Sequence, residues 1–469
     1  MIDMEREMTL PSRLWRGLTA ALLSTTSLVA LAEEAVEKAA EAATDAAPAA
    51  AEAAAAAVAP VLNSGDTAWV ACCALFVTLL LIPGLALFYG GLARSKNVLS
   101  ILMQIFTGSA LVSLLFAIYG YSFIFVDGGS LQSLIGGAGK VFLAGITNDS
   151  LQGTIPEWLY VFFMLLFAAI TPVIICGAFA ERIKFSAVLV FLAVWFTINY
   201  VPQAHMAWAG GWVFNLGALD FAGGNVVHVN VGAASLVGAY LVGRRKGFGT
   251  SSLAPHNMTM TMTGGSIVWV GWLGFCGGCA YAASGFAMLV VLNNSLAACA
   301  GAVAWTLVEW AHRGKPSVLG AVSGAIAGLV AITPACGYVG PMGAIACGLI
   351  TAPICCWAVE KLKPMIGLDD SFDVFGVHGT GGIVGSALSV IFALPALGGV
   401  GFAEGRDLSS QLMVNLGVTG FTFVYSVISS WIAFKIAALF CGGLRVDEEQ
   451  EVDGLDLSSH GEVGYKYSN

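Results

Sequence analysis

The sequence predicts an all-α membrane protein that crosses the bilayer eleven times. Three observations support this prediction. The 469 residues are 58% apolar and only 10% charged, with a mean hydropathy of +0.83, whereas a soluble globular protein carries about 25% charged residues. Apolar runs of about 20 residues, long enough to cross a hydrocarbon core, recur through the chain. One motif, an aspartate followed eight residues later by a histidine, occurs twice.

The N-terminal residues predict export. Arg13 and Arg16 precede the apolar stretch Gly17–Leu31, and a basic segment followed by a short apolar one is typical of a signal peptide. We therefore expect a cleaved signal peptide over residues 1–32, with an uncleaved anchor helix as the alternative. Residues 33–64 are mostly alanine with scattered glutamate, and we interpret them as an extracytoplasmic linker.

The apolar runs between residues 65 and 442 predict the membrane helices. Each run is long enough to span the bilayer, although the ends are uncertain by several residues. We place the eleven helices at 67–91, 98–126, 158–180, 185–203, 225–243, 258–282, 285–311, 317–335, 338–359, 374–395 and 411–441.

Basic residues predict the orientation, because short loops rich in Lys and Arg stay in the cytoplasm. The loops after even-numbered helices hold only Lys140 and Arg406. The bundle therefore starts outside an inner or plasma membrane, and its tail, residues 443–469, is cytoplasmic. The basic residues after odd-numbered helices are Arg94, Lys96, Arg182, Lys184, Arg244, Arg245, Lys246, Arg313, Lys315, Lys361, Lys363 and Arg445.

The repeated motif predicts an internal duplication. Asp220 precedes His228 on the fifth helix, and Asp370 precedes His378 on the tenth, 150 residues later. Two consecutive five-helix halves insert with opposite orientation, and such inverted repeats typically place their functional site at the midplane between them. We therefore expect a 5+5 inverted repeat plus one extra helix, with the two histidines meeting near the centre.

Small residues predict close packing. Gly320, Gly324 and Gly328 form a stripe that lets helix backbones approach each other. Most of the eleven cysteines lie inside predicted helices, and none has the spacing of a zinc site. We interpret the cysteines as packing residues and expect no metal and no cofactor.

Paired histidines inside a membrane indicate function. A buried imidazole needs hydrogen-bond partners and is costly when charged. For His228 or His378 taken alone, the alternative to a functional role is a structural histidine that is hydrogen-bonded to a neighbouring helix. Two histidines at equivalent positions of the repeat favour a functional role more strongly. Imidazoles in contact can share a proton while offering a donor and an acceptor to a small polar molecule.

Several segments resemble the ammonium transporter family (Amt/Mep/Rh), and they are closer to its bacterial and plant Amt branch than to its Rh branch. Together they span nearly the whole chain from about residue 65, and the match is very specific. The resemblance implies a homotrimer in which each protomer has its own narrow pore. The segments are IPGLALFYGGLARSKN (82–97), ITPVIICGAFAERIKFSA (170–187), HMAWAGGW (205–212), DFAGGNVVHVNVGAASLVGAYLVGR (220–244), FDVFGVHGTGG (372–382) and GLRVDEEQEVDGLDLSSHGE (443–462).

The resemblance also implies a role for individual residues. Paired histidines line the family's pore, two stacked phenylalanines close it, aromatic residues surround its outer vestibule, and an acidic residue heads the fifth helix. The corresponding residues are His228 and His378 for the pair, Phe167 and Phe275 for the closure, Trp208 and Phe163 for the vestibule, and Asp220 for the acidic position.

The chain departs from the family at two positions. Cys279 stands where a serine hydroxyl usually helps to hold the cation. A thiol is a weaker hydrogen-bond partner, so we expect weaker recruitment of ammonium. Val231 stands where small residues are common, and we interpret it as tolerated packing. Asp220 and Asp370 are expected to accept backbone N–H bonds at helix starts, although a role as proton acceptor stays open.

The expected activity is ammonium transport, in which ammonium loses a proton before ammonia enters a dry pore. Expected partners are ammonium or ammonia, methylammonium as an analogue, membrane lipids and a P-II-type nitrogen regulatory protein at the tail, but no nucleic acid. On composition alone the tail is a solvated end; the resemblance implies contacts between protomers.

Two other functions were weighed against transport. One is an ammonium sensor of the same fold. The short tail that ends at Asn469 leaves no room for a fused output domain, and this argues against a sensor. The other is a membrane enzyme, for which we find no motif such as HExxH.

Overall fold

The computed structural model describes residues 61–465. The predicted signal peptide and all but the last residues of the predicted linker lie outside the described residues. Within residues 61–465, nine helices are long and apolar enough to cross a membrane. Two further helices, α11 and α13, lie between them in the chain and complete a set that agrees with the expected eleven.

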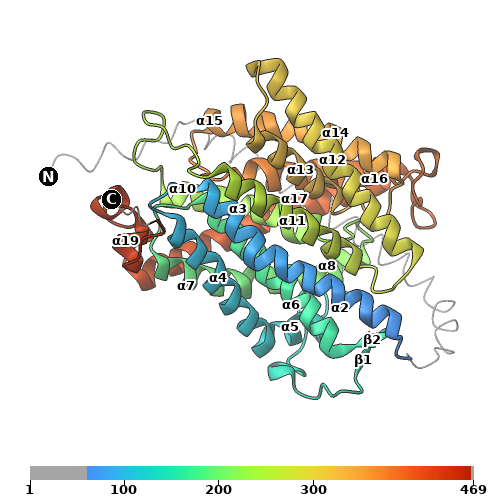
Figure 1. Cartoon of the computed structure of the whole chain (residues 1–469). Helices are drawn as coiled ribbons and strands as arrows, with labels where there is room; N and C mark the ends of the chain where they lie inside the picture. Colours follow the sequence, from blue (N-terminus) through green and yellow to red (C-terminus); the bar gives the residue numbers. More distant parts are fainter. Residues whose placement is uncertain (1–60, 466–469) are drawn as a thin grey trace. The chain divides into compact units, whose positions relative to one another are not determined.

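The helices pack side by side as one bundle (Figure 1). Several consist of an α-helix continued by a short π- or 3-10-helical turn, labelled η. In chain order they are α2–η1–α3 (Ser64–Leu92), α4–η2–α5 (Val98–Phe125), α6–η5 (Glu157–Ala178), α7–η6–α8–α9 (Phe185–Asn215), η7–α10 (Gly224–Val242), α11 (Met258–Gly278), α12 (Gly285–Arg313), α13 (Val318–Ile332), α14–η8–α15 (Pro341–Ile366), η9–α16 (Phe375–Phe392) and α17 (Leu408–Cys441).

Short elements occupy the connections. A two-stranded antiparallel hairpin precedes α6, and two short helices form the tail after α17. These elements are η3 (Gly129–Leu131), η4 (Val141–Leu143), β1 (Leu151–Gln152), β2 (Ile155–Pro156), η10 (Pro395–Leu397), α18 (Glu448–Asp453) and α19 (Leu455–His460).

Most predicted helix ends are confirmed within a few residues, because apolar runs end where polar loops begin. The prediction of 185–203 was too short. The fourth helix extends to Asn215. Its extension contains the buried His205, whose ring nitrogens lie 2.6 and 2.7 Å from the carbonyl oxygens of Ile124 and Gln132. Hydropathy does not register such a pairing.

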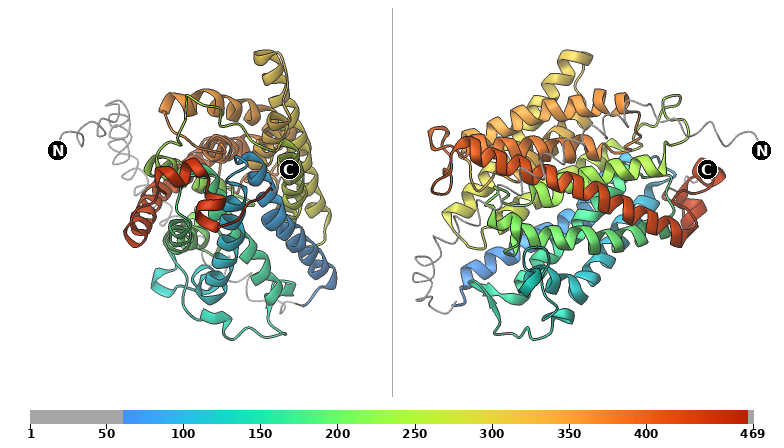
Figure 2. Two further views of the ribbon diagram at one scale, coloured as in Figure 1. Left: turned by 60° about the vertical axis from the view of Figure 1, so that its left-hand side comes forward. Right: turned by 180° about the vertical axis from the view of Figure 1, so that it is seen from behind.

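Side-chain polarity is inverted relative to a soluble protein. Large apolar side chains such as Phe106, Leu307 and Leu439 are exposed on the outer surface. The 34-residue helix α17, drawn in orange and red across one face of the bundle in Figure 2, instead buries polar residues, including Asn415, Thr419 and Ser426. Interhelical hydrogen bonds from such side chains hold membrane helices together.

The two halves repeat their backbone hydrogen bonds, which confirms the inverted duplication. Just before each histidine-bearing helix, two N–H groups donate to the C-terminal end of a helix in the opposite half, all at 3.1 Å. The bonds are Phe221 N–H to Pro334 O, Ala222 N–H to Thr333 O, Ser371 N–H to Ala178 O and Phe372 N–H to Gly177 O. The donors in the second half lie 150 residues after those in the first.

The loops that follow odd-numbered helices meet at one end of the bundle. Glu181 accepts from Arg94 Nε at 2.7 Å, and Arg245 pairs with both Glu181 and Asp369, at 3.3 and 2.8 Å. Burial would raise the pKa of Asp369, but the hydrogen bonds and charges of Arg245 and Arg182 outweigh it and hold the pKa below its usual range. A buried network of this kind is stable only while every charge stays paired.

The tail docks on this same end, so its interpretation as a purely solvated segment was wrong. Leu455 N–H donates to Asn97 Oδ1, and Ser100 N–H donates to Asp456 Oδ1, both at 2.8 Å. Leu455 and Asp456 are consequently buried. Each of the helices α4 and α19 therefore receives a capping interaction from the other, although more than 350 residues separate them.

Candidate functional site

An aromatic cavity of about 160 Å³ opens beside the C-terminal end of α11. Trp208 and Phe167 form part of its wall, and their rings meet edge to face with centroids 5.5 Å apart. Cys279 also lines it and donates its S–H to Phe275 O at 3.3 Å. The full lining is Tyr160, Met164, Phe167, Trp208, Phe214, Phe221, Cys279 and Tyr281. We call this space the outer cavity.

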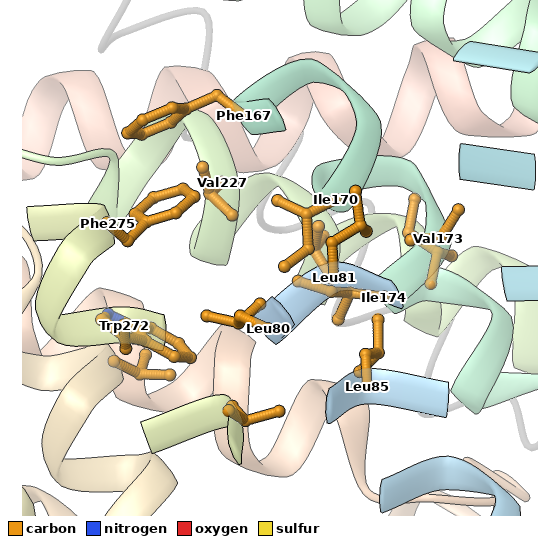
Figure 3. Packing of buried hydrophobic residues seen from close by; sticks show 14 of the residues in the cluster. Leu80, Leu81, Leu85, Phe167, Ile170, Val173, Ile174, Val227, Trp272 and Phe275 are labelled. Carbon is orange, nitrogen blue, oxygen red and sulfur yellow. The ribbon is translucent and has the colours of Figure 1, made fainter. Parts of the chain in front are cut away.

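Phe167, which lines the outer cavity, packs against Phe275. Their ring centroids are only 3.7 Å apart, and the side chains are 1% and 4% exposed. Figure 3 shows the two rings beside Val227, with Trp272 further along the same helix as Phe275. The expected phenylalanine pair is thus in contact, and the surrounding side chains are apolar.

The two histidines are also in contact. His228 Nδ1 lies 3.1 Å from His378 Nδ1, and the rings are nearly parallel with centroids 5.2 Å apart. Trp272 stacks on the other face of His228 at 5.1 Å and is fixed by its own hydrogen bond to Thr333 Oγ1. Buried His228 Nε2 has no protein partner among the described residues, so it is free to bind a small polar molecule.

The backbone around each histidine is adapted to this contact. Both lie in π-helical turns, η7 (Gly224–Val229) and η9 (Phe375–Gly379), and such turns are frequent at functional sites. Glycine permits the close approach of the two helices: a Cβ on Gly232 would lie 2.2 Å from Gly379 Cα.

Asp220 and Asp370 occupy equivalent places as helix caps. Asp220 accepts the N–H groups of Gly224 and Asn225, and Asp370 accepts that of Phe375 at 2.8 Å. Burial raises the pKa of each carboxyl to about 6, and the accepted N–H bonds partly offset the effect of burial. The geometry agrees with the capping interpretation for both aspartates.

A second cavity, of about 220 Å³, lies on the other side of the histidine pair. His378 lines it, as do the charged side chains of Arg245, Lys363 and Asp373. Lys363 pairs with Asp373, which has a left-handed backbone with φ of 60°. We call this space the inner cavity. Charged side chains thus form part of its wall, whereas none of the described residues that line the outer cavity is charged.

Five rings lie in succession between the two cavities. Phe167 borders the outer cavity and touches Phe275; Trp272 lies one turn before Phe275 on α11 and stacks on His228; His378 borders the inner cavity.

The structure places Phe163 differently from the other expected vestibule residues. Phe163 is fully buried, packs on Phe167 and Tyr281, and is not among the residues that line the outer cavity. Tyr160, about one turn earlier on α6, lines the cavity instead. Sequence reasoning also missed Trp272, although its position three residues before Phe275 puts both on one face of a helix.

All eleven cysteines have free thiols; seven are buried, as packing residues would be, whereas Cys72 and Cys299 are exposed. Val231 is completely buried within α10. The glycine stripe at Gly320, Gly324 and Gly328 packs as expected: a Cβ on Gly324 or Gly328 would clash with the backbone of α12.

Comparisons with known proteins agree with this architecture. The model of the Ammonium Transporter Family matches residues 68–465. The ammonium transporter of Bacillus subtilis is 45% identical over 411 residues, covering 87% of this chain and all of the relative. The crystal structure of Candida albicans Mep2 is 32% identical with a TM-score of 0.76, covering 83% of this chain and 88% of that one.

A solved sensor Amt protein is similar as well. It is 29% identical with a TM-score of 0.78, and the match covers 84% of this chain and 98% of the other. The curated relatives bear the names of transporters rather than enzymes. This chain therefore belongs to the ammonium transporter family.

Proposed function

We propose that the protein recruits ammonium in the outer cavity, removes a proton from it, and conducts ammonia past the phenylalanine and histidine pairs to the inner cavity. The observation that carries this proposal is the succession of rings between the two cavities, which includes an apolar phenylalanine pair and paired imidazoles. The names and structures of the relatives support ammonium as the substrate.

Recruitment relies on the aromatic walls of the outer cavity. A cation over the face of a ring gains about 0.5–2 kcal/mol from the ring quadrupole, and Trp208 and Tyr160 both border the space. This attraction concentrates monovalent cations but does not distinguish ammonium from potassium, since the two have nearly the same size and charge.

Selection requires a property that potassium lacks. Moving an intact ion into a dry medium costs an idealised ~20 kcal/mol, whereas deprotonating ammonium costs only about 1.4 kcal/mol per pH unit below its pKa. The contact between Phe167 and Phe275 leaves no room for a hydrated ion between the rings. The far lower cost of admitting a neutral molecule therefore favours the passage of ammonia over that of potassium.

The histidine pair then replaces some of the hydrogen bonds that ammonia loses. One ring nitrogen of His228 is unpaired among the described side chains, and the other faces His378 at 3.1 Å. A shared proton between the rings lets the pair act as donor or acceptor. We propose that the pair also carries the released proton separately, which makes net transport electrogenic.

A current measurement on purified protein in proteoliposomes tests this mechanism. An ammonium pulse should evoke a current in the wild type and potassium should not, while the double variant His228→Leu and His378→Leu should lose the ammonium current. His312→Leu, at an exposed histidine, is the matched control and should keep it. An unchanged current in the double variant would refute the proton relay, and robust potassium flux would refute the dry pore.

Several features remain proposals that follow from the family. We propose a homotrimer in an inner or plasma membrane, with the N-terminal side of the bundle outside and the tail in the cytoplasm, where a P-II-type protein docks. Clustering of the basic loops and the tail at one end supports the orientation. Cysteine labelling of Cys441 from either side of sealed vesicles tests it.

A sensor role is the second candidate, since a sensor Amt protein has a similar structure. Both functions need recruitment of ammonium, but only a transporter needs a conducting path. Accumulation of methylammonium in proteoliposomes distinguishes them: binding without accumulation would favour the sensor.

A further inference from the structure

Two sulfur atoms line the outer cavity. Cys279 follows the last residue of α11, and Met164 lies on α6, and both side chains border the same space of about 160 Å³. They come from different halves of the internal duplication. In the ammonium recruitment proposed above, the aromatic rings supply the main attraction, and Cys279 contributes only as a weak hydrogen-bond partner.

Both sulfurs are available to a ligand. The thiol of Cys279 is partly exposed and donates its proton to Phe275 O at 3.3 Å, which leaves the sulfur lone pairs unused. The thioether of Met164 accepts one hydrogen bond, from the Tyr281 hydroxyl at 3.2 Å, and keeps a second lone pair.

The remaining walls exclude hard cations. None of the described residues that line the outer cavity is a carboxylate, whereas magnesium and calcium require oxygen ligands. Among residues 61–465 there is also no group of three or more His, Cys, Asp or Glu side chains arranged to hold a metal ion. A metal bound here must accept few ligands, and those ligands are soft sulfurs.

We infer that the outer cavity binds a soft monovalent metal cation, cuprous copper or silver, through Cys279 Sγ and Met164 Sδ. Thiolate and thioether ligands select Cu(I) among biological metals, and two ligands suffice for a monovalent d¹⁰ ion. The S–H bond of Cys279 breaks, an S–metal bond forms, and the proton leaves to water. The oxidation state of the metal does not change.

The bound metal should block transport. It occupies the space in which ammonium is recruited, and it carries the same charge, so the two cations compete. This consequence rests on the proposed function, whereas metal binding does not. The two are therefore measured separately, with silver as a probe that does not undergo redox cycling.

Binding is measured on the full-length protein in detergent, in chloride-free buffer. Cys72 and Cys299 are exposed thiols outside the cavity, so both are first changed to serine. Silver retained after desalting is then counted by mass spectrometry. Loss of an outer-shell partner already costs about 10–100-fold in metal affinity, so Cys279→Ser should weaken silver binding by at least ~100-fold and Met164→Leu by a smaller factor.

The buried, neighbouring thiols of Cys276 and Cys336 provide the competing site. Cys336→Ser should leave silver binding at the cavity unchanged. If silver binding survives in Cys279→Ser but is lost in Cys336→Ser, the buried pair is the site and the inference is wrong. Equal silver binding in Cys279→Ser and its parent background would also overturn it.

Block of transport is measured as the silver concentration that halves each variant's own ammonium current. This half-blocking silver concentration should rise in Cys279→Ser by the same factor by which silver binding weakens. Silver binding without block would keep the metal site and instead contradict recruitment through the outer cavity. Block that persists in Cys279→Ser would show that silver acts elsewhere.

Discussion

Gly232→Ala tests whether the contact between the two histidine-bearing helices controls both stability and transport. A Cβ at position 232 would lie 2.2 Å from Gly379 Cα and 2.6 Å from Gly379 N. Carbon atoms pack at about 3.5–4.0 Å, so the helices must separate locally by roughly 1 Å or more. No side-chain rotation relieves the clash, because both opposing atoms belong to the backbone.

The expected magnitude follows from this displacement. Overpacking a close contact costs about 1–3 kcal/mol, and backbone atoms give way less readily than side chains, so we expect the upper part of that range. His228 Nδ1 and His378 Nδ1 are 3.1 Å apart, and a hydrogen bond is lost once the separation reaches about 3.6 Å. A shift of half an ångström therefore suffices to break the pair.

The assay combines thermal unfolding in detergent with ammonium-evoked current. Gly232→Ala should unfold at a lower temperature and lose most of its current. Gly420→Ala is the matched control on α17, where an added Cβ meets nothing within 4 Å, and it should be neutral or stabilising by up to about 1 kcal/mol. If Gly232→Ala retained wild-type unfolding and current, the close approach of the helices would not be required.

Three further predictions concern the outer site. Trp208→Leu should raise the ammonium concentration for half-maximal current several-fold, because the lost cation–π attraction is worth about 0.5–2 kcal/mol. Cys279→Ser should lower that concentration, because a hydroxyl is the better hydrogen-bond partner. Asp220→Asn keeps an acceptor oxygen for the cap and should unfold at a higher temperature than Asp220→Ala. The pKa of Asp220, about 6, exceeds its unfolded value of about 3.9. Its stabilising contribution is therefore full below pH ~4 and is lost as pH rises through about 6, and Asp220→Asn should flatten the stability profile over that window.

Each of these predictions has a clear contrary result. An unchanged half-maximal concentration in Trp208→Leu would remove the aromatic recruitment step. Equal apparent affinity of Cys279→Ser and the wild type would show that the residue 279 side chain does not touch the cation. Identical unfolding temperatures for Asp220→Asn and Asp220→Ala would contradict the capping role, and an unaltered pH profile in Asp220→Asn would contradict the raised pKa of Asp220.

Some positions in the site followed from pattern alone. The spacing of Asp220 and His228, repeated at Asp370 and His378, predicted the duplication, and the hydrogen bonds confirm it. The pattern works because a duplicated segment keeps the same local backbone in both copies. It did not reveal which aromatic residues face the outer cavity. Phe163 and Tyr160 lie about one turn apart on the same helix and both pack on Tyr281, but only Tyr160 lines the cavity.

By itself, the sequence determined the class of protein, the approximate ends of most of its membrane helices, and the pairing of the halves. These properties depend on hydropathy and local spacing, which are readable along the chain. Only the tertiary structure decided that Trp272 stacks on His228, that two sulfurs share the outer cavity, and that the tail caps α4. Such contacts join residues far apart in sequence, and their geometry is set by how whole helices pack.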